Sequence, residues 1–227
     1  MNVHHISAER LTIDRVRHII QSGMKLALSD DARRRIERCR EYLDRKMENQ
    51  ERPIYGITTG FGSLCNISID KHQLSELQKN LVMSHACGTG ERVPSQIVRL
   101  MLLLKVQSLS YGNSGVQLAT VERLIDFFNE DILPVVFQQG SLGASGDLAP
   151  LAHLSLPLLG LGEVEYKGSQ RPAAEVLAEK GWEPIELQSK EGLALLNGTQ
   201  FMSAFGVWSL IGARRLSVWA DHIAAMS

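Results

Sequence analysis

The chain has 227 residues, of which 44% are hydrophobic and 22% are charged, and its formal net charge at pH 7 is -1. This length allows a sizeable buried core, and the charge balance excludes the strong positive bias of a nucleic-acid-binding protein. Its uninterrupted apolar runs fall short of the roughly 18 residues that span a membrane. We therefore expect a soluble protein with neither a membrane nor a nucleic acid as its partner.

The three cysteines, Cys39, Cys65 and Cys87, are far apart and form no Cys-x-x-Cys pair. This usage is typical of a reducing compartment, so the chain is expected to be cytoplasmic. The seven histidines show no metal-binding spacing, and no metal site is expected.

Helical periodicity dominates the first half of the chain. Ser29 is a favourable N-cap, Asp30 and Asp31 follow in the first turn, and apolar residues continue at helical spacing to about Asn49. The arginines of this segment alternate with acidic residues, which favours a solvated, ion-paired helix face. Further helices are predicted over about 70–86, 94–111 and 116–130, and the first of these is expected to place Leu74, Leu77 and Leu81 on one face.

The second half begins with an almost wholly apolar segment at 147–160, which is typical of the middle of a helical bundle and is expected to kink at Pro157. A hairpin turning at Gly168-Ser169 and a small helix over 172–180 follow. The last helix is predicted from about Thr199 and is still running at Ala225. The expected fold is mainly α: one domain over 1–227, built as a helical bundle with a loop-rich N-terminal region and a small β-hairpin.

Residues 140–150 read Gly-Ser-Leu-Gly-Ala-Ser-Gly-Asp-Leu-Ala-Pro and contain a tripeptide that is suited to react with itself. Gly146 has no Cβ, so its nitrogen can approach the Ala144 carbonyl carbon unusually closely. Ring closure with loss of water, followed by loss of the Ser145 hydroxyl as a second water, would leave an electrophilic methylidene-imidazolone. On the tripeptide alone, a glycine-rich turn before a helix is the favoured interpretation.

Three further segments accompany this string: Pro-Ile-Tyr-Gly-Ile-Thr-Thr-Gly-Phe-Gly at 53–62, Ser-His at 84–85, and Leu-Leu-Asn-Gly-Thr at 195–199. Together they resemble the aromatic amino acid ammonia-lyases, and within that family the histidine-specific members most closely. The resemblance implies that Ala144, Ser145 and Gly146 cyclise autocatalytically to the methylidene-imidazolone (MIO) cofactor.

The resemblance also implies a role for each remaining motif. Tyr55 would be the base that removes a β-proton of the substrate, and the pair Ser84 and His85 would grip the substrate side chain. Asn197 would reach the prosthetic ring and the polar head of the substrate, and Asp147 would assist cyclisation. Each residue also has a structural interpretation: a loop tyrosine, a helix-end histidine, an Asn-Gly boundary, and an N-cap aspartate.

The implied reaction is elimination of ammonia from L-histidine to give urocanate, through attack on either the substrate amine or its ring. A lyase or aminomutase acting on another aromatic amino acid is the alternative within the family, and an inert binding or assembly fragment is the alternative outside it. The resemblance covers roughly the first half of a family chain, and the last helix looks truncated. Family active sites draw on several subunits of a homotetramer, so this chain alone is expected to be inactive.

Overall fold

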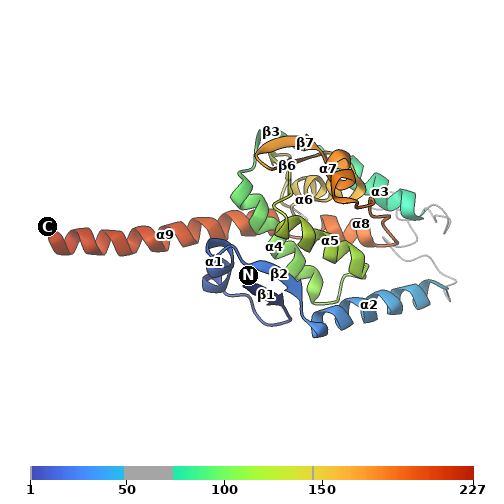
Figure 1. Ribbon diagram of the computed structural model, residues 1–227, viewed down its shortest axis with the longest axis horizontal. Helices are drawn as coiled ribbons and strands as arrows, with labels where there is room; N and C mark the ends of the chain where they lie inside the picture. The colour runs from blue at the N-terminus through green and yellow to red at the C-terminus, as the bar shows by residue number, and fades with distance from the viewer. Residues whose placement is uncertain (1, 49–73, 145) are drawn as a thin grey trace.

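The structure is a computed structural model that describes residues 2–48, 74–144 and 146–227. A helical body carries a small parallel strand pair near its N-terminus, and the last helix extends away from the body to the C-terminus (Figure 1). The helices of the described ranges are α1 (Ile13–Gln21), α2 (Asp30–Glu48), α3 (Leu74–His85), α4 (Ser95–Ser110), α5 (Leu118–Asn129), α6 (Leu148–Ser155), α7 (Ala173–Lys180), α8 (Glu191–Leu196) and α9 (Gln200–Met226). The strands are β1 (Val3–Ile6), β2 (Lys25–Leu28), β3 (Thr89–Arg92), β4 (Leu133–Pro134), β5 (Phe137–Gln139), β6 (Glu163–Tyr166) and β7 (Ser169–Pro172). The mainly α fold predicted from the sequence is confirmed.

Helix α4 lies at the centre of the body, where it packs against α5 and the first turns of α9. It is apolar around most of its circumference, and its buried residues include Leu100, Met101 and Leu103. Each such side chain contributes roughly 1.5–3 kcal/mol through removal from water. The helix predicted over 94–111 is therefore present, with Pro94 directly before it.

The expected loop-rich N-terminal region contains regular structure. Strands β1 and β2 pair in parallel around α1, in a register that places Ile6 opposite Leu28. The Asn129 side chain accepts from the Leu26 amide at 2.7 Å and donates to the Leu26 carbonyl at 2.9 Å. Four-residue strands are too short to show a periodicity in the sequence, which is why they were not predicted.

The start that the sequence predicts for α2 and the ion pairs on its surface are both confirmed. The Ser29 hydroxyl accepts a hydrogen bond from the Ala32 amide at 3.2 Å, as an N-cap does. Ion pairs join its arginines to acidic side chains, in the combinations Arg33 with Glu122 at 2.7 Å, Arg35 with Asp31 at 2.8 Å, and Arg40 with Asp44.

The buried face of α3 differs from the leucine face that its spacing predicts. Leu74, Gln78 and Val82 are buried, whereas Leu77 and Leu81 are only partly covered. Gln78 takes an inward position because its Oε1 accepts a hydrogen bond from the Gly192 amide at 3.0 Å. A long-range polar contact therefore sets the rotation of this helix.

The helix predicted over 147–160 with a kink at Pro157 is shorter than expected, and Pro157 lies in a 3₁₀ turn directly after the regular α-helix ends. Helix α6 stops at Ser155, and a 3₁₀ turn over Leu156–Leu159 follows. The hairpin of β6 and β7 also forms, but its turn is Lys167-Gly168, with φ of +52° and +76°, rather than Gly168-Ser169. Strand β4 adds a third strand to this sheet.

Helix α9 is 27 residues long, and its second half makes few contacts with the body. Figure 1 shows it projecting beyond every other element. Its large exposed apolar side chains are Met202, Trp208, Leu210, Leu216, Val218, Trp219, Ile223 and Met226. Across the described ranges, the length and apolarity needed to cross a membrane are not combined in any helix.

Candidate active site

A cavity of about 200 Å³ lies where the end of α3 meets the glycine-rich loop before α6. It brings His85 together with Ala144 and Gly146, which are far away in the sequence. Its described lining residues are His85, Cys87, Gly140, Leu142, Gly143, Ala144, Gly146, Leu148 and Ala149. Two of the four predicted motifs therefore share one cavity.

Gly146 occupies a position that no other residue can take. Its φ is +108°, and a Cβ there would lie 2.6 Å from the Gly198 carbonyl oxygen. Directly after it, the Asp147 amide donates to the same oxygen at 2.8 Å. Gly143, in contrast, has a positive φ but open space around it. The tripeptide loop thus packs at Gly146 against the Asn-Gly motif.

Asp147 is an N-cap, but its carboxylate caps a different helix from the one that it precedes. The residue is buried and stands directly before α6, yet no side-chain hydrogen bond caps that helix. Instead, its Oδ2 accepts from the Met202 amide at 3.0 Å, in the first turn of α9. One residue thereby ties the tripeptide loop to the start of α9.

Asn197 follows the six-residue helix α8 directly, and its amide donates to the Leu193 carbonyl at 3.0 Å. Its side chain is exposed. Because Gly198 contacts both Gly146 and Asp147, the structure brings Asn197 beside the tripeptide loop. The third motif therefore reaches the same region.

Two buried charged residues, neither of which was predicted from the sequence, hold the ends of α8. At its N-terminal end, the Glu191 carboxylate accepts from the Gln117 amide at 2.8 Å and the Thr120 hydroxyl at 2.7 Å. At its C-terminal end, Lys105 Nζ donates to the carbonyl oxygens of Ala194 at 2.8 Å and Asn197 at 3.3 Å. Complete burial lowers the pKa of Lys105 to about 7.

His85 lies at the end of α3 with its ring partly buried. Its Nδ1 is 2.8 Å from the Leu81 carbonyl oxygen, which only accepts, so this nitrogen carries a hydrogen. In the neutral ring, Nε2 then keeps its lone pair as an acceptor. Ser84 is exposed and donates its hydroxyl to the Leu81 carbonyl at 3.0 Å, and it is not among the described lining residues of the cavity.

His153, an isolated histidine in the sequence, fixes the turn that follows His85. Its Nε2 accepts from the Gly88 amide at 2.9 Å, and burial lowers its pKa below the ordinary 6.5. A Cβ on Gly88 would lie 3.0 Å from the imidazole. This pairing sets the position of Cys87 and the end of α3, and no local sequence signal points to it.

Tyr55 and Ser145 lie outside the described residues, so the predicted base and the central residue of the tripeptide are not placed by the structure. Ala144 and Gly146, on either side of Ser145, are both described and both line the cavity.

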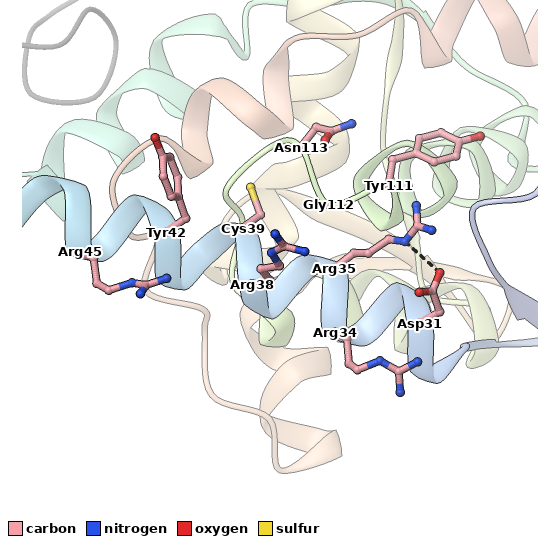
Figure 2. Close-up of a pocket in the computed structure, with 10 residues that line it drawn as sticks. All are labelled: Asp31, Arg34, Arg35, Arg38, Cys39, Tyr42, Arg45, Tyr111, Gly112 and Asn113. Carbon is pink, nitrogen blue, oxygen red and sulfur yellow. Dashed lines mark ion pairs between the residues drawn. The ribbon is translucent and has the colours of Figure 1, made fainter.

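A separate groove of about 820 Å³ runs along α2 and the Tyr111-Gly112-Asn113 turn. Figure 2 shows the arginines of α2 around it, with Arg35 pointing to Asp31. None of the described residues that the sequence predicts as functional lines this groove. In the described part of the chain, His, Cys, Asp and Glu side chains form no group of three that could hold a metal ion.

The fold and the site define the class of the protein. The solved structure of histidine ammonia-lyase from Trypanosoma cruzi superposes with a TM-score of 0.88 at 40% identity, over 97% of this chain and 43% of that one. Phenylalanine aminomutase from Pantoea agglomerans gives a TM-score of 0.88 at 33% identity, over 95% of this chain and 41% of that one. The architecture is therefore that of the ammonia-lyases and aminomutases.

The sequence itself gives the family. The family described as aromatic amino acid lyase matches residues 11–227, and the chain belongs to it. Histidine ammonia-lyase from Deinococcus radiodurans is 51% identical over 96% of this chain. Histidine ammonia-lyase from Staphylococcus aureus is 46% identical over 98% of it. The chain spans 41% and 44% of the length of these two relatives.

Proposed function

We propose that a family-length protein containing this chain eliminates ammonia from L-histidine to give urocanate. The observation that carries the proposal is the convergence of His85, Gly146 and Asn197 on one region. The names of the relatives at 46% and 51% identity support the choice of histidine as substrate.

The described residues fit a methylidene-imidazolone at Ala144-Ser145-Gly146. Gly146 has the backbone conformation and the close contact that exclude a Cβ, and the buried Ser141 hydroxyl in the same loop has no partner among the described residues. When formed, this group supplies an electrophile that ordinary side chains lack, which eases loss of ammonia from the substrate.

Each site residue then has a defined task. His85 Nε2 accepts an N–H of the substrate imidazole, and its other nitrogen stays bonded to Leu81. Tyr55 takes the proton from the substrate Cβ. Asn197 holds the polar head of the substrate, and Asp147 assists cyclisation while it fixes the loop to α9.

An aminomutase is the second candidate, because the Pantoea agglomerans phenylalanine aminomutase superposes as well as the lyase does. A mutase would return ammonia to Cβ and yield a β-amino acid. The Ser84-His85 pair favours histidine over phenylalanine as substrate, but it does not separate elimination from migration.

The exposed apolar surface of α9 supports assembly into a homo-oligomer, which we propose to be a tetramer in the cytoplasm. Histidine is the small-molecule partner of this assembly.

Product analysis tests the function. The family-length protein is incubated separately with L-histidine, L-phenylalanine and L-tyrosine, with Ser145→Ala as the control that lacks the hydroxyl to be eliminated. We expect urocanate from histidine with the wild type and none with Ser145→Ala. Absence of urocanate from the wild type would contradict the proposed function, and a β-amino acid as the main product would favour the mutase.

A further inference from the structure

The position of Asn197 depends on contacts made by α8. This helix has only six residues. A helix this short is not stable by itself, so side chains from other elements must hold it in place. Lys105 of α4 makes two hydrogen bonds to its C-terminal end, one to Ala194 and one to Asn197 itself.

Burial of the Lys105 amine at the end of a helix is unfavourable in free energy. Lys105 is fully buried, and in the described part of the structure no carboxylate pairs with it. An unpaired ammonium in an apolar interior is strongly unfavourable, and an apolar side chain of similar volume would be better tolerated. When the ammonium loses a proton, the neutral amine keeps two N–H groups, one for each of the two carbonyl acceptors. Stability alone therefore does not account for a lysine here.

We propose that Lys105 is a positioning residue for the reaction, acting through Asn197. By binding the Ala194 and Asn197 carbonyls, it sets the direction in which the chain leaves α8. That direction places Gly198 against Gly146 and Asp147 and keeps the Asn197 carboxamide beside the tripeptide. This role rests on the proposed histidine elimination.

The first test compares Lys105→Met with Gln107→Met in the family-length protein. Gln107 is a matched control, because it is a buried polar residue of the same helix that donates to a backbone carbonyl, Ser7, at 2.8 Å. Lys105→Met should lower kcat on the order of ten- to a hundredfold, as small misplacements of reacting groups do, with much less change in KM and no loss of Tm. Gln107→Met should keep kcat within about twofold.

A double-mutant cycle then tests whether Lys105 acts through Asn197. In an Asn197→Ala background, Lys105→Met should change kcat by less than about twofold, because the group that it positions is already gone. A further tenfold loss in that background would overturn the proposal, as would a wild-type kcat in Lys105→Met alone. If the methionine variant does not fold, Lys105→Gln, which is too short to reach both carbonyls, replaces it with the same deciding outcomes.

Amide hydrogen exchange separates this inference from the proposed function, because it needs no turnover. In peptides covering 191–199, exchange should be faster in Lys105→Met than in the wild type and unchanged in Gln107→Met. Equal protection in all three proteins would refute the positioning role even if histidine is deaminated. If the wild type forms no urocanate but exchange in 191–199 is still faster in Lys105→Met, the contact made by Lys105 is upheld and the proposed function fails.

Discussion

His85 and Ser84 are neighbours in sequence, but they stand differently in the site. The His85 ring lines the cavity, whereas the Ser84 hydroxyl is turned back to the carbonyl of Leu81. Of the two residues that the sequence predicts to hold the substrate, we therefore expect His85 to contribute more to substrate binding than Ser84.

We predict that His85→Leu lowers kcat/KM for histidine by on the order of a hundredfold or more and raises it for phenylalanine, because a hydrogen-bonding site is replaced by an apolar one. Ser84→Ala, the matched control, should change either value by less than about tenfold, the worth of one exposed hydrogen bond. Specificity constants for both substrates provide the measurement. An unchanged ratio in His85→Leu would mean that this histidine only ends its helix.

Lys105 predicts a pH dependence of stability with a definite sign. Its pKa is about 7 in the folded protein against an ordinary value of 10.5. Between these values the unfolded chain binds the proton that the folded protein lacks, so stability rises with pH. The slope is about 1.4 kcal/mol per pH unit for one such group.

The difference in Tm between the wild type and Lys105→Met should therefore move in favour of the wild type as pH rises from 7 to 10. Thermal unfolding at three or four pH values measures it. A difference in Tm that stays constant across this pH range would show that burial does not lower the pKa of Lys105.

Functional residues could be predicted from the sequence where they lie in a local motif. They could not be predicted where their role arises from packing between elements that are distant in the chain. Gly146 and Asn197 lie in contiguous strings that the sequence displays. Lys105 and Glu191 acquire their roles only when α4 and α5 pack against α8, more than sixty residues away in the chain. No spacing rule connects such pairs.

At the scale of elements, the link between the tripeptide loop and α9 is the carboxylate of Asp147. It accepts a hydrogen bond from the Met202 amide in the first turn of α9, one of the helix N–H groups that has no partner within its own helix. The loop and the helix are thus fixed together by one side chain.

We predict that Asp147→Ala lowers the free energy of unfolding by about 1 to 2 kcal/mol, the usual worth of an N-cap. Asp147→Asn should retain most of that stability, because asparagine caps helices as well as aspartate does. Thermal unfolding of both variants distinguishes them. Equal destabilisation by alanine and asparagine would indicate that the charge matters, not the cap.

Elements with strong local signals were predicted, and those without them were not. Ser29 before α2 and Pro157 after α6 mark real boundaries. The β1-α1-β2 unit was missed because its strands have four residues each, and the buried face of α3 was wrong because Gln78 bonds to Gly192. Propensity and periodicity carry no information about such long-range hydrogen bonds.

For the molecule as a whole, α9 presents an apolar surface that the described residues do not cover. Surfaces of this kind are typical of interfaces. The relatives, moreover, are more than twice as long as the chain. We infer that further polypeptide, from the same protein or from partner subunits, packs along this helix.

The 227-residue chain alone should therefore self-associate and form no urocanate, while the family-length protein should turn over histidine. Light scattering and a urocanate assay on the two forms measure this. Robust turnover by a monomeric 227-residue chain would contradict the inference that the site is completed from outside.

The proposed reaction depends most on the conversion of Ala144-Ser145-Gly146 into the reactive group. Trypsin releases residues 124–167 as one peptide, because no lysine or arginine lies between Arg123 and Lys167. Its mass, measured from the family-length protein, should be lower than the sequence mass by two waters, and the Ser145→Ala peptide should not show this loss. An unmodified mass in catalytically competent wild-type protein would contradict the account.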